Sequence, residues 1–136
     1  TKKNQKREVK ILPKIWKYCI EKTENAAELA DFYSSADVFV NPTLEDTYPT
    51  TNLESMSCGT PVISYNTGGS VESIDNLTGL IVEKEDVAGL YSAILEIKNN
   101  GKSIYTVACR EKAKLQFNKN SKFIEYISLY KKLLKI

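Results

Sequence analysis

The sequence predicts an α/β protein in which an open parallel sheet is flanked by helices and followed by a helical C-terminus. Short apolar runs with little alternation, such as 37–41 and 61–65, are typical of strands buried on both faces of a parallel sheet. Between them, apolar residues recur every three to four positions, which is the period of an amphipathic helix. Since strands and helices alternate, we expect right-handed crossovers between parallel strands.

The first part of the chain is expected to hold strands at 9–12, 15–20 and 37–41. A helix is predicted at 26–35, because a polar cluster typical of a helix start, Thr23-Glu24-Asn25, precedes it. The apolar residues around this helix share one face: Leu29, Phe32, Tyr33 and Ala36.

A helix is also predicted at 50–58, because proline is favoured at a first helical turn and Gly59 suits a C-terminal cap. We expect the elements after it to be a strand at 61–65, a flexible turn at 66–70, a helical segment at 71–74, a turn at 76–79 and a strand at 80–82.

The rest of the chain is predicted to be helical, with three apolar stripes that face the core. The first stripe comprises Val87, Leu90, Tyr91, Ile94 and Leu95 and the second Ile104, Val107, Ala108 and Leu115. Ser121 is expected to cap a third helix, which carries Phe123, Ile124, Ile127, Tyr130 and Leu134.

Length and composition fit one globular domain of 136 residues, of which 42% are hydrophobic and 26% charged. No apolar run approaches the ~18 residues of a membrane span, so we expect neither a transmembrane helix nor a signal peptide. The net charge of +2 is too small to argue for nucleic acid. The basic start of the chain is expected to be a solvated tail, with contact to a phosphate or an anionic membrane surface as the alternative.

Histidine is absent, which excludes Ser-His-Asp and Cys-His mechanisms and makes most zinc sites implausible. The cysteines, Cys19, Cys58 and Cys109, are widely spaced and odd in number. They favour a reducing compartment over a disulfide framework and are expected to be small core residues. The chemistry must therefore run on carboxylates, hydroxyls, amines and backbone amides, and nothing in the pattern requires a metal.

Residues 44–62 concentrate the polar groups that suit a ligand. If a helix starts at Pro49 or Thr50, the free amides of Thr50, Thr51 and Asn52 point outward at the positive end of the helix dipole. Such a helix start suits a phosphate or diphosphate. In an open parallel sheet, ligands bind where loops meet at the carboxyl ends of the strands.

Two carboxylates flank this helix start. Glu54, about one turn further in, is placed to accept hydrogen bonds from vicinal hydroxyls such as those of a ribose. Asp46, on the other side of the turn, is placed to do the same for a sugar. A phosphate held between two hydroxyl-binding acids describes a nucleotide-diphosphate sugar.

The stretch resembles the E-x7-E element of the retaining GT-B-fold glycosyltransferases of family 4. Seven residues separate Asp46 from Glu54, and Ser-Met-Ser-Cys-Gly-Thr-Pro-Val follows, similar to the E-A-M-A-C-G-T-P-V of that family. The segments 28–33 and 36–43 upstream, Thr67-Gly68-Gly69 with Glu72, and the turn before residues 80–82 also fit. The similarity covers about residues 15–82 well and the C-terminal helices only in character.

The resemblance implies roles for single residues. Glu54 matches the acid that binds the donor ribose, and Asp46 matches the catalytic acid that contacts the transferred sugar and stabilises charge at its anomeric centre. The residues that match the turn holding the sugar and the diphosphate are Thr47, Tyr48, Thr50, Thr51 and Asn52. The weaker candidates are Glu45, Thr23, Gly68 and Gly69.

This sequence departs from the family pattern in two places. The first acid is Asp46 rather than glutamate, and the neighbouring Glu45 competes with it for this role. Pro49 stands where many members have glycine, so one amide donor is lost and the phosphate contacts are expected to shift to Thr50 and Thr51.

The resemblance also implies a larger enzyme. Residues 1–136 are expected to be a Rossmann-like donor-binding domain, the incomplete C-terminal half of a GT-B fold, without the N-terminal acceptor domain and an early G-R-x-x-x-K-G segment. The implied partners are a nucleotide-sugar donor and a sugar or lipid-linked acceptor, with no further cofactor. The whole protein is expected in the cytoplasm, with contact to the inner face of the membrane left open. It is expected to act in polysaccharide or glycolipid synthesis. The fragment alone is expected to be inactive.

Other interpretations stay open. A related GT-B nucleotide-sugar epimerase and a non-catalytic nucleotide-binding module share the expected fold, whereas a dinucleotide site is disfavoured because no G-x-G-x-x-G follows a strand. Asp46 and Glu54 are also explained as ordinary acids near a helix start, and Gly68 and Gly69 as a plain tight turn.

Overall fold

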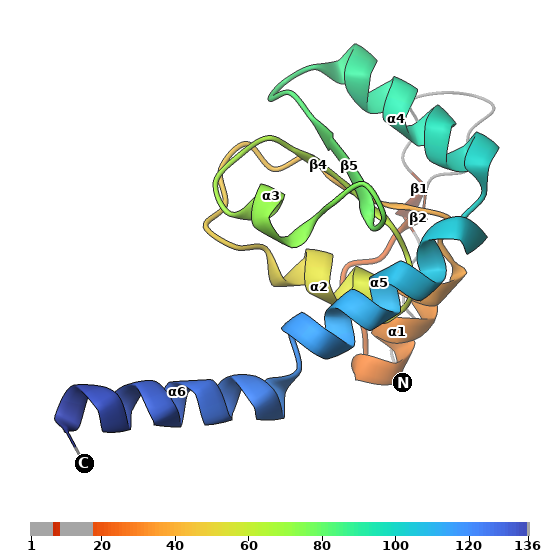
Figure 1. Cartoon of the computed structure of the whole chain (residues 1–136). Helices are drawn as coiled ribbons and strands as arrows, with labels where there is room; N and C mark the ends of the chain where they lie inside the picture. Colours follow the sequence, from red (N-terminus) through yellow and green to blue (C-terminus); the bar gives the residue numbers. More distant parts are fainter. Residues whose placement is uncertain (1–6, 9–17, 136) are drawn as a thin grey trace.

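A computed structural model of the chain describes residues 7–8 and 18–135 (Figure 1). Its first two strands, β1 (Arg7–Glu8) and β2 (Tyr18–Cys19), form an antiparallel pair. The predicted strand at 9–12 lies outside the described residues, as do residues 15–17 of the second one. The expectation that this second strand opens the parallel sheet is wrong, because β2 pairs with β1 instead.

The parallel sheet consists of β3 (Phe39–Asn41), β4 (Val62–Tyr65) and β5 (Gly79–Val82), with β4 in the centre. Val40 lies opposite Ile63, and Ser64 lies opposite Ile81. Every residue of β4 is buried, as the run without alternation predicts for a central parallel strand. Because the three strands run in the same direction, the loops after them leave the sheet at one edge.

Helices cover both faces of this sheet (Figure 1). On one side lie α1 (Ala26–Ser35), α2 (Thr50–Ser57) and α5 (Ser103–Gln116), and on the other lies α4 (Val87–Asn100). A single turn, α3 (Ser70–Ser73), follows β4. The α/β class and the predicted bounds of α1 are confirmed.

Local sequence explains where these helices begin and end. The side chain of Asn25 accepts the amide of Glu28 at 3.0 Å and caps α1. Cys58 ends α2, one residue earlier than predicted, and Gly59 follows with a φ of 77°, a conformation that glycine adopts without strain. Lys102 donates to the carbonyl of Ala36 at 2.8 Å and so ties the start of α5 to the end of α1.

The predicted core-facing stripes of α4 and α5 are confirmed only in part. On α5, Ile104, Val107 and Leu115 are exposed, whereas the buried residues are Tyr105, Cys109 and Ala113. On α4, the predicted Leu90 and Ile94 pack against the core, whereas Val87, Tyr91 and Leu95 are exposed. The fully buried residues of α4 are Ala93 and Ile97. The packed face of α5 thus combines one aromatic residue with two small ones, and most of the predicted apolar residues lie on other faces.

The third stripe is wrong, because α6 (Lys119–Leu134) has no buried residue. It begins at Asn118, whose side chain accepts the amides of Asn120 and Ser121, so Ser121 is not the capping residue. Figure 1 shows α6 extending away from the rest of the molecule. Its large apolar residues are exposed, at 49–68%: Phe123, Ile124, Tyr126, Ile127, Leu129, Tyr130, Leu133 and Leu134.

Candidate functional site

The loop between β3 and α2, residues 42–49, leaves the carboxyl end of β3 and carries the predicted catalytic acid. The amide of Tyr48 donates to Oδ1 of Asp46 at 3.0 Å, so this carboxylate shapes the turn in which it stands. No hydrogen bond involves Oδ2 of Asp46 within the described part of the chain. Asp46 therefore has one oxygen committed to the loop and one left for a ligand.

The turn after β4 supports this loop. The amide of Gly69 donates to the carbonyl oxygen of Asp46 at 3.2 Å. The hydroxyl of Thr67 donates to the carbonyl oxygen of Thr43 at 3.1 Å. A Cβ at Gly68 would clash with the carbonyl oxygen of Asp46, and a Cβ at Gly69 would clash with that of Thr47. Both glycines are thus required by the close approach of two loops, which goes beyond the plain tight turn that the sequence allows.

The N-terminus of α2 is open. Pro49 is the N-cap, with φ −70° and ψ 110°, and no side chain caps the helix. Among the described residues, the amides of Thr50 and Thr51 have no hydrogen-bond partner. The structure thus leaves two donors free at the positive end of the helix.

The expected third donor is not free, because the amide of Asn52 bonds to the carbonyl of Pro49 at 3.2 Å in a tight first turn. Asn52 is fully buried, and its Oδ1 accepts from Nδ2 of Asn41 at 2.9 Å. This pair joins the end of β3 to the first turn of α2. The Nδ2 of Asn52 is buried and has no partner in the described part of the chain.

Glu54 lies exposed on α2 and accepts a hydrogen bond at 3.2 Å from the hydroxyl of Tyr33 on α1. Burial, together with the negative charge of Glu54, raises the pKa of Tyr33 to about 12. The hydroxyl therefore stays protonated and remains a donor at neutral pH. Tyr33 is itself fixed, because its carbonyl accepts from Thr60 at 2.6 Å and its ring meets Phe39 edge-on, with centroids 5.3 Å apart.

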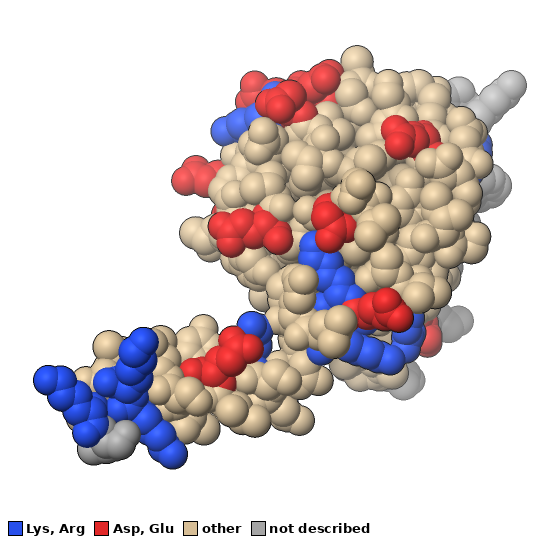
Figure 2. Space-filling model, viewed as in Figure 1, with Lys and Arg blue, Asp and Glu red and all other residues tan. Residues whose placement is uncertain are grey.

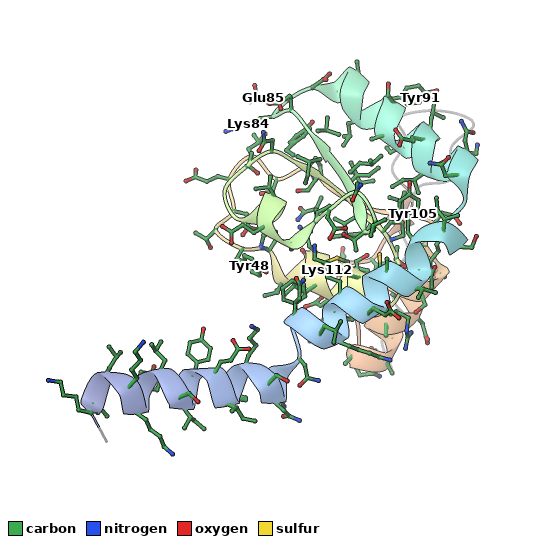
Figure 3. The ribbon with its side chains drawn as sticks, viewed as in Figure 1. Tyr48, Lys84, Glu85, Tyr91, Tyr105 and Lys112 are labelled. Atoms are coloured by element: carbon green, nitrogen blue, oxygen red, sulfur yellow. The ribbon has the colours of Figure 1, made fainter. Side chains whose placement is uncertain are left out.

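The remaining predicted residues have mixed surroundings. Tyr48 is half-buried against Phe117, with ring centroids 6.4 Å apart (Figure 3), and burial and the charge of Glu72 raise its pKa. Thr47 lies exposed in the same loop. Glu45 is exposed, and its carbonyl accepts from the hydroxyl of Thr43 at 3.1 Å. Thr23 precedes α1, and no hydrogen bond joins it to the loop in the part of the chain that is described.

Sequence reasoning missed Tyr33 and Asn41 as supports of this site. Both lie in segments that resemble the family, but their partners, Glu54 and Asn52, are 21 and 11 residues away in sequence. Within residues 7–8 and 18–135, no three His, Cys, Asp or Glu side chains are grouped so as to hold a metal ion. In the same residues, no helix combines the length and apolarity needed to span a bilayer.

Open helix starts at the carboxyl ends of parallel strands are where α/β domains bind phosphorylated ligands, and this chain has the architecture of that class. The model of the family "glycosyl transferases group 1" matches residues 2–100. The chain belongs to this family.

Individual relatives agree with the family. The chain is 42% identical over 65 residues to D-inositol 3-phosphate glycosyltransferase of Arthrobacter sp. (strain FB24). The aligned stretch covers 47% of this chain and 15% of the relative. It is 30% identical over 97 residues to D-inositol 3-phosphate glycosyltransferase 2 of Catenulispora acidiphila, or 65% of this chain and 23% of the relative. The match thus spans less than a quarter of these relatives.

A solved structure agrees as well. Sucrose-phosphate synthase from Thermosynechococcus elongatus superposes with a TM-score of 0.70 and 32% identity, over 79% of this chain and 28% of that one. The similarity shows the same α/β architecture as in this GT-B protein.

Proposed function

We propose that this chain is the donor-binding part of a retaining glycosyltransferase, which transfers a sugar from a nucleotide-diphosphate sugar to a hydroxyl group. The observation that carries the proposal is the open start of α2, where the amides of Thr50 and Thr51 are free and lie between Asp46 and Glu54 in the sequence. A diphosphate bound there receives two hydrogen bonds at the positive end of the helix. The leaving charge is stabilised at the same place.

Glu54 is assigned to the ribose hydroxyls. Its Oε2 is held by Tyr33, which leaves Oε1 to accept from a vicinal hydroxyl. A carboxylate cannot favour the diphosphate by charge, so a hydroxyl partner suits it better. Asp46 is assigned to the transferred sugar, because one of its oxygens is unoccupied and the other fixes the loop.

The rest of the machinery is assigned to regions beyond this donor half. An N-terminal acceptor domain and cations that neutralise the diphosphate complete the enzyme in this proposal, and the donor half alone is inactive. The acceptor is a sugar or a lipid-linked sugar in polysaccharide or glycolipid synthesis, on the cytoplasmic side of the membrane. The names of the relatives, which include an inositol phosphate glycosyltransferase, support a hydroxyl acceptor.

The test is calorimetric titration of the chain with a set of nucleoside diphosphates. Glu54→Ala is expected to weaken the binding at least tenfold, about 1.4 kcal/mol. Glu96→Ala removes an equally exposed acid from α4, far along the chain, and is the matched control. Equal affinities of the two variants would remove the ribose assignment.

Catalysis is tested separately on the full-length protein. Asp46→Asn is expected to abolish most sugar transfer while nucleotide binding persists. Donor binding without any turnover by the unmodified full-length protein would favour a non-catalytic nucleotide-binding module instead.

A further inference from the structure

A hollow of about 220 Å³ lies beside α2, against the second half of α5 and the residues that follow it. Its Phe117 also contacts Tyr48, just before the start of α2. Its lining residues are Ser57, Arg110, Ala113, Lys114, Phe117 and Asn118. Buried Ala113 and half-buried Phe117 supply an apolar wall, and the other four residues supply polar atoms. None of the lining residues is acidic.

The two cations of this hollow are uncompensated. Arg110 and Lys114 stand four residues apart on one face of α5, and neither has a hydrogen bond or an ion pair within the described residues. Lys112, between them in sequence, points toward another part of the molecule and pairs with Asp75 at 2.6 Å (Figure 3). The same helix thus pairs one of its cations and leaves two beside the hollow.

Arg110 and Lys114 do not cap α2, because neither side chain donates to a carbonyl of its last turn among the described residues. The carbonyl of Ser57 has no partner there, and four others are satisfied. That of Leu53 accepts from the hydroxyl of Ser57 at 2.7 Å, and that of Met56 accepts from the amide of Gly59 at 2.9 Å. The carbonyls of Glu54 and Ser55 accept from the amide of Cys58. Arg110 passes beside Gly59 and donates to none of these carbonyls.

Asn118 adds a third donor. Its Oδ1 accepts the amides of Asn120 at 3.0 Å and Ser121 at 3.3 Å, which fixes the side chain at the start of α6. No partner of its Nδ2 is found in the part of the chain that is described. Arg110, Lys114 and Asn118 thus bring three donors to the hollow, and none of its lining residues carries a negative charge.

We propose that this hollow, referred to below as the α2–α5 pocket, binds a phosphate group, with Arg110 and Lys114 as its cationic ligands and Asn118 as a further donor. A guanidinium group binds phosphate oxygens through paired hydrogen bonds, and an ammonium group adds a point charge. The volume is below the ~300–1,000 Å³ of ordinary ligand pockets, so the occupant is a small phosphorylated group rather than a nucleotide. The pocket is built from other residues than the free amides of Thr50 and Thr51, and the proposal does not depend on the proposed function.

The test is an NMR titration of the chain with inorganic phosphate, which follows the signals of Arg110, Lys114 and Asn118. Saturable shifts at these residues are expected, and the double variant Arg110→Gln/Lys114→Gln is expected to bind at least tenfold more weakly. Lys98→Gln/Lys131→Gln is the control, because these exposed lysines lie, like Lys114, in the last turns of helices and the change in net charge is the same. Equal weakening in both variants, or shifts spread over all lysines, would overturn the pocket.

A second arm separates a free phosphate from a lipid headgroup. Sedimentation with phosphatidylcholine vesicles, with and without phosphatidic acid, is compared for the chain and both double variants. Phosphate binding without vesicle binding supports a soluble phosphorylated ligand. Vesicle binding that only the pocket variant loses supports a headgroup, and the absence of both responses overturns the proposal. A thermal melt of each variant checks that it is folded. The pocket variant is expected to fold, because Arg110 and Lys114 are both exposed.

Discussion

Single residues outside the motif decide how the acids of the site are held. Tyr33 donates to one oxygen of Glu54 and remains protonated, because its pKa is raised to about 12. Asn41 holds the buried side chain of Asn52 beneath the start of α2. The site thus depends on α1 and β3 as much as on the loop that carries its acids.

Asp75 links stability to pH at the same scale. Burial alone would raise its pKa, but the hydrogen bonds from Lys112, the amide of Leu77 and the hydroxyl of Thr78 outweigh it, and the pKa is lowered. A lowered carboxyl pKa stabilises the fold above the unfolded-state value of about 3.9, and this stabilisation is lost as the pH falls through the folded-state value.

Asp75→Asn is therefore expected to lower the free energy of unfolding at pH 7 by about 1 kcal/mol or less, because the carboxylate is half exposed. The difference from the unmodified chain should shrink as the pH falls below about 4. Urea unfolding at several pH values measures it. Glu125→Gln breaks the more exposed pair of α6 and should change stability less; a larger effect of Glu125→Gln would contradict this account.

At the scale of elements, two loops from neighbouring strands form one support. The turn after β4 presses its glycines against the backbone of the loop after β3, and the carboxyl ends of both strands lie at the same edge of the sheet. The position of Asp46 therefore depends on a turn about twenty residues further along the chain.

Gly68→Ala tests this support. Its positive φ of 45° strains any side chain, and the new Cβ meets the carbonyl oxygen of Asp46, so we expect a loss of about 1–3 kcal/mol in unfolding free energy and weaker nucleotide binding. Gly101 also has a positive φ, of 82°, but a Cβ there would meet only Ser103 Oγ, at 3.9 Å. Gly101→Ala should therefore leave nucleotide binding unchanged. Chemical unfolding and calorimetry measure both effects, and equal behaviour of the two variants would contradict the support.

The last element, α6, adds little to the folded body in this chain. It buries no residue, and Figure 2 shows basic side chains at its free end, where Lys131 and Lys132 lie in the last turn. Ending the chain after Asn118 is expected to shift the melting midpoint by less than about 4 °C. Ending it after Gly101 removes buried Tyr105, Cys109 and Ala113 and should unfold the protein. Circular dichroism measures both, and a large fall after the first truncation would show that α6 packs on the body.

On the scale of the whole molecule, the sequence predicted the elements better than their faces. Pro42, Gly59 and the unalternating run 61–65 are local signals, and they placed β3, α2 and β4 well. The inward face of α5 was not predictable from apolar size, because small Cys109 and Ala113 are buried there with Tyr105 while Ile104 and Leu115 are exposed. Likewise, local spacing indicated the acids of the site, whereas the contact between Tyr33 and Glu54 depends on how α1 packs on α2.

The central claim is that the free amides at the start of α2 bind the diphosphate of the donor, and Thr50 allows a direct measurement. Thr50→Pro removes one amide hydrogen. The fold should tolerate it, because proline is favoured at the first helical position and the residue before it, Pro49, already has the extended backbone that a following proline requires. Thr50→Ala keeps the amide and loses the hydroxyl.

Calorimetric titration with the preferred nucleoside diphosphate should show Thr50→Pro binding about tenfold more weakly than Thr50→Ala, with both variants equally folded. Equal affinities would contradict the account, because the diphosphate would then not be held by the amides of α2.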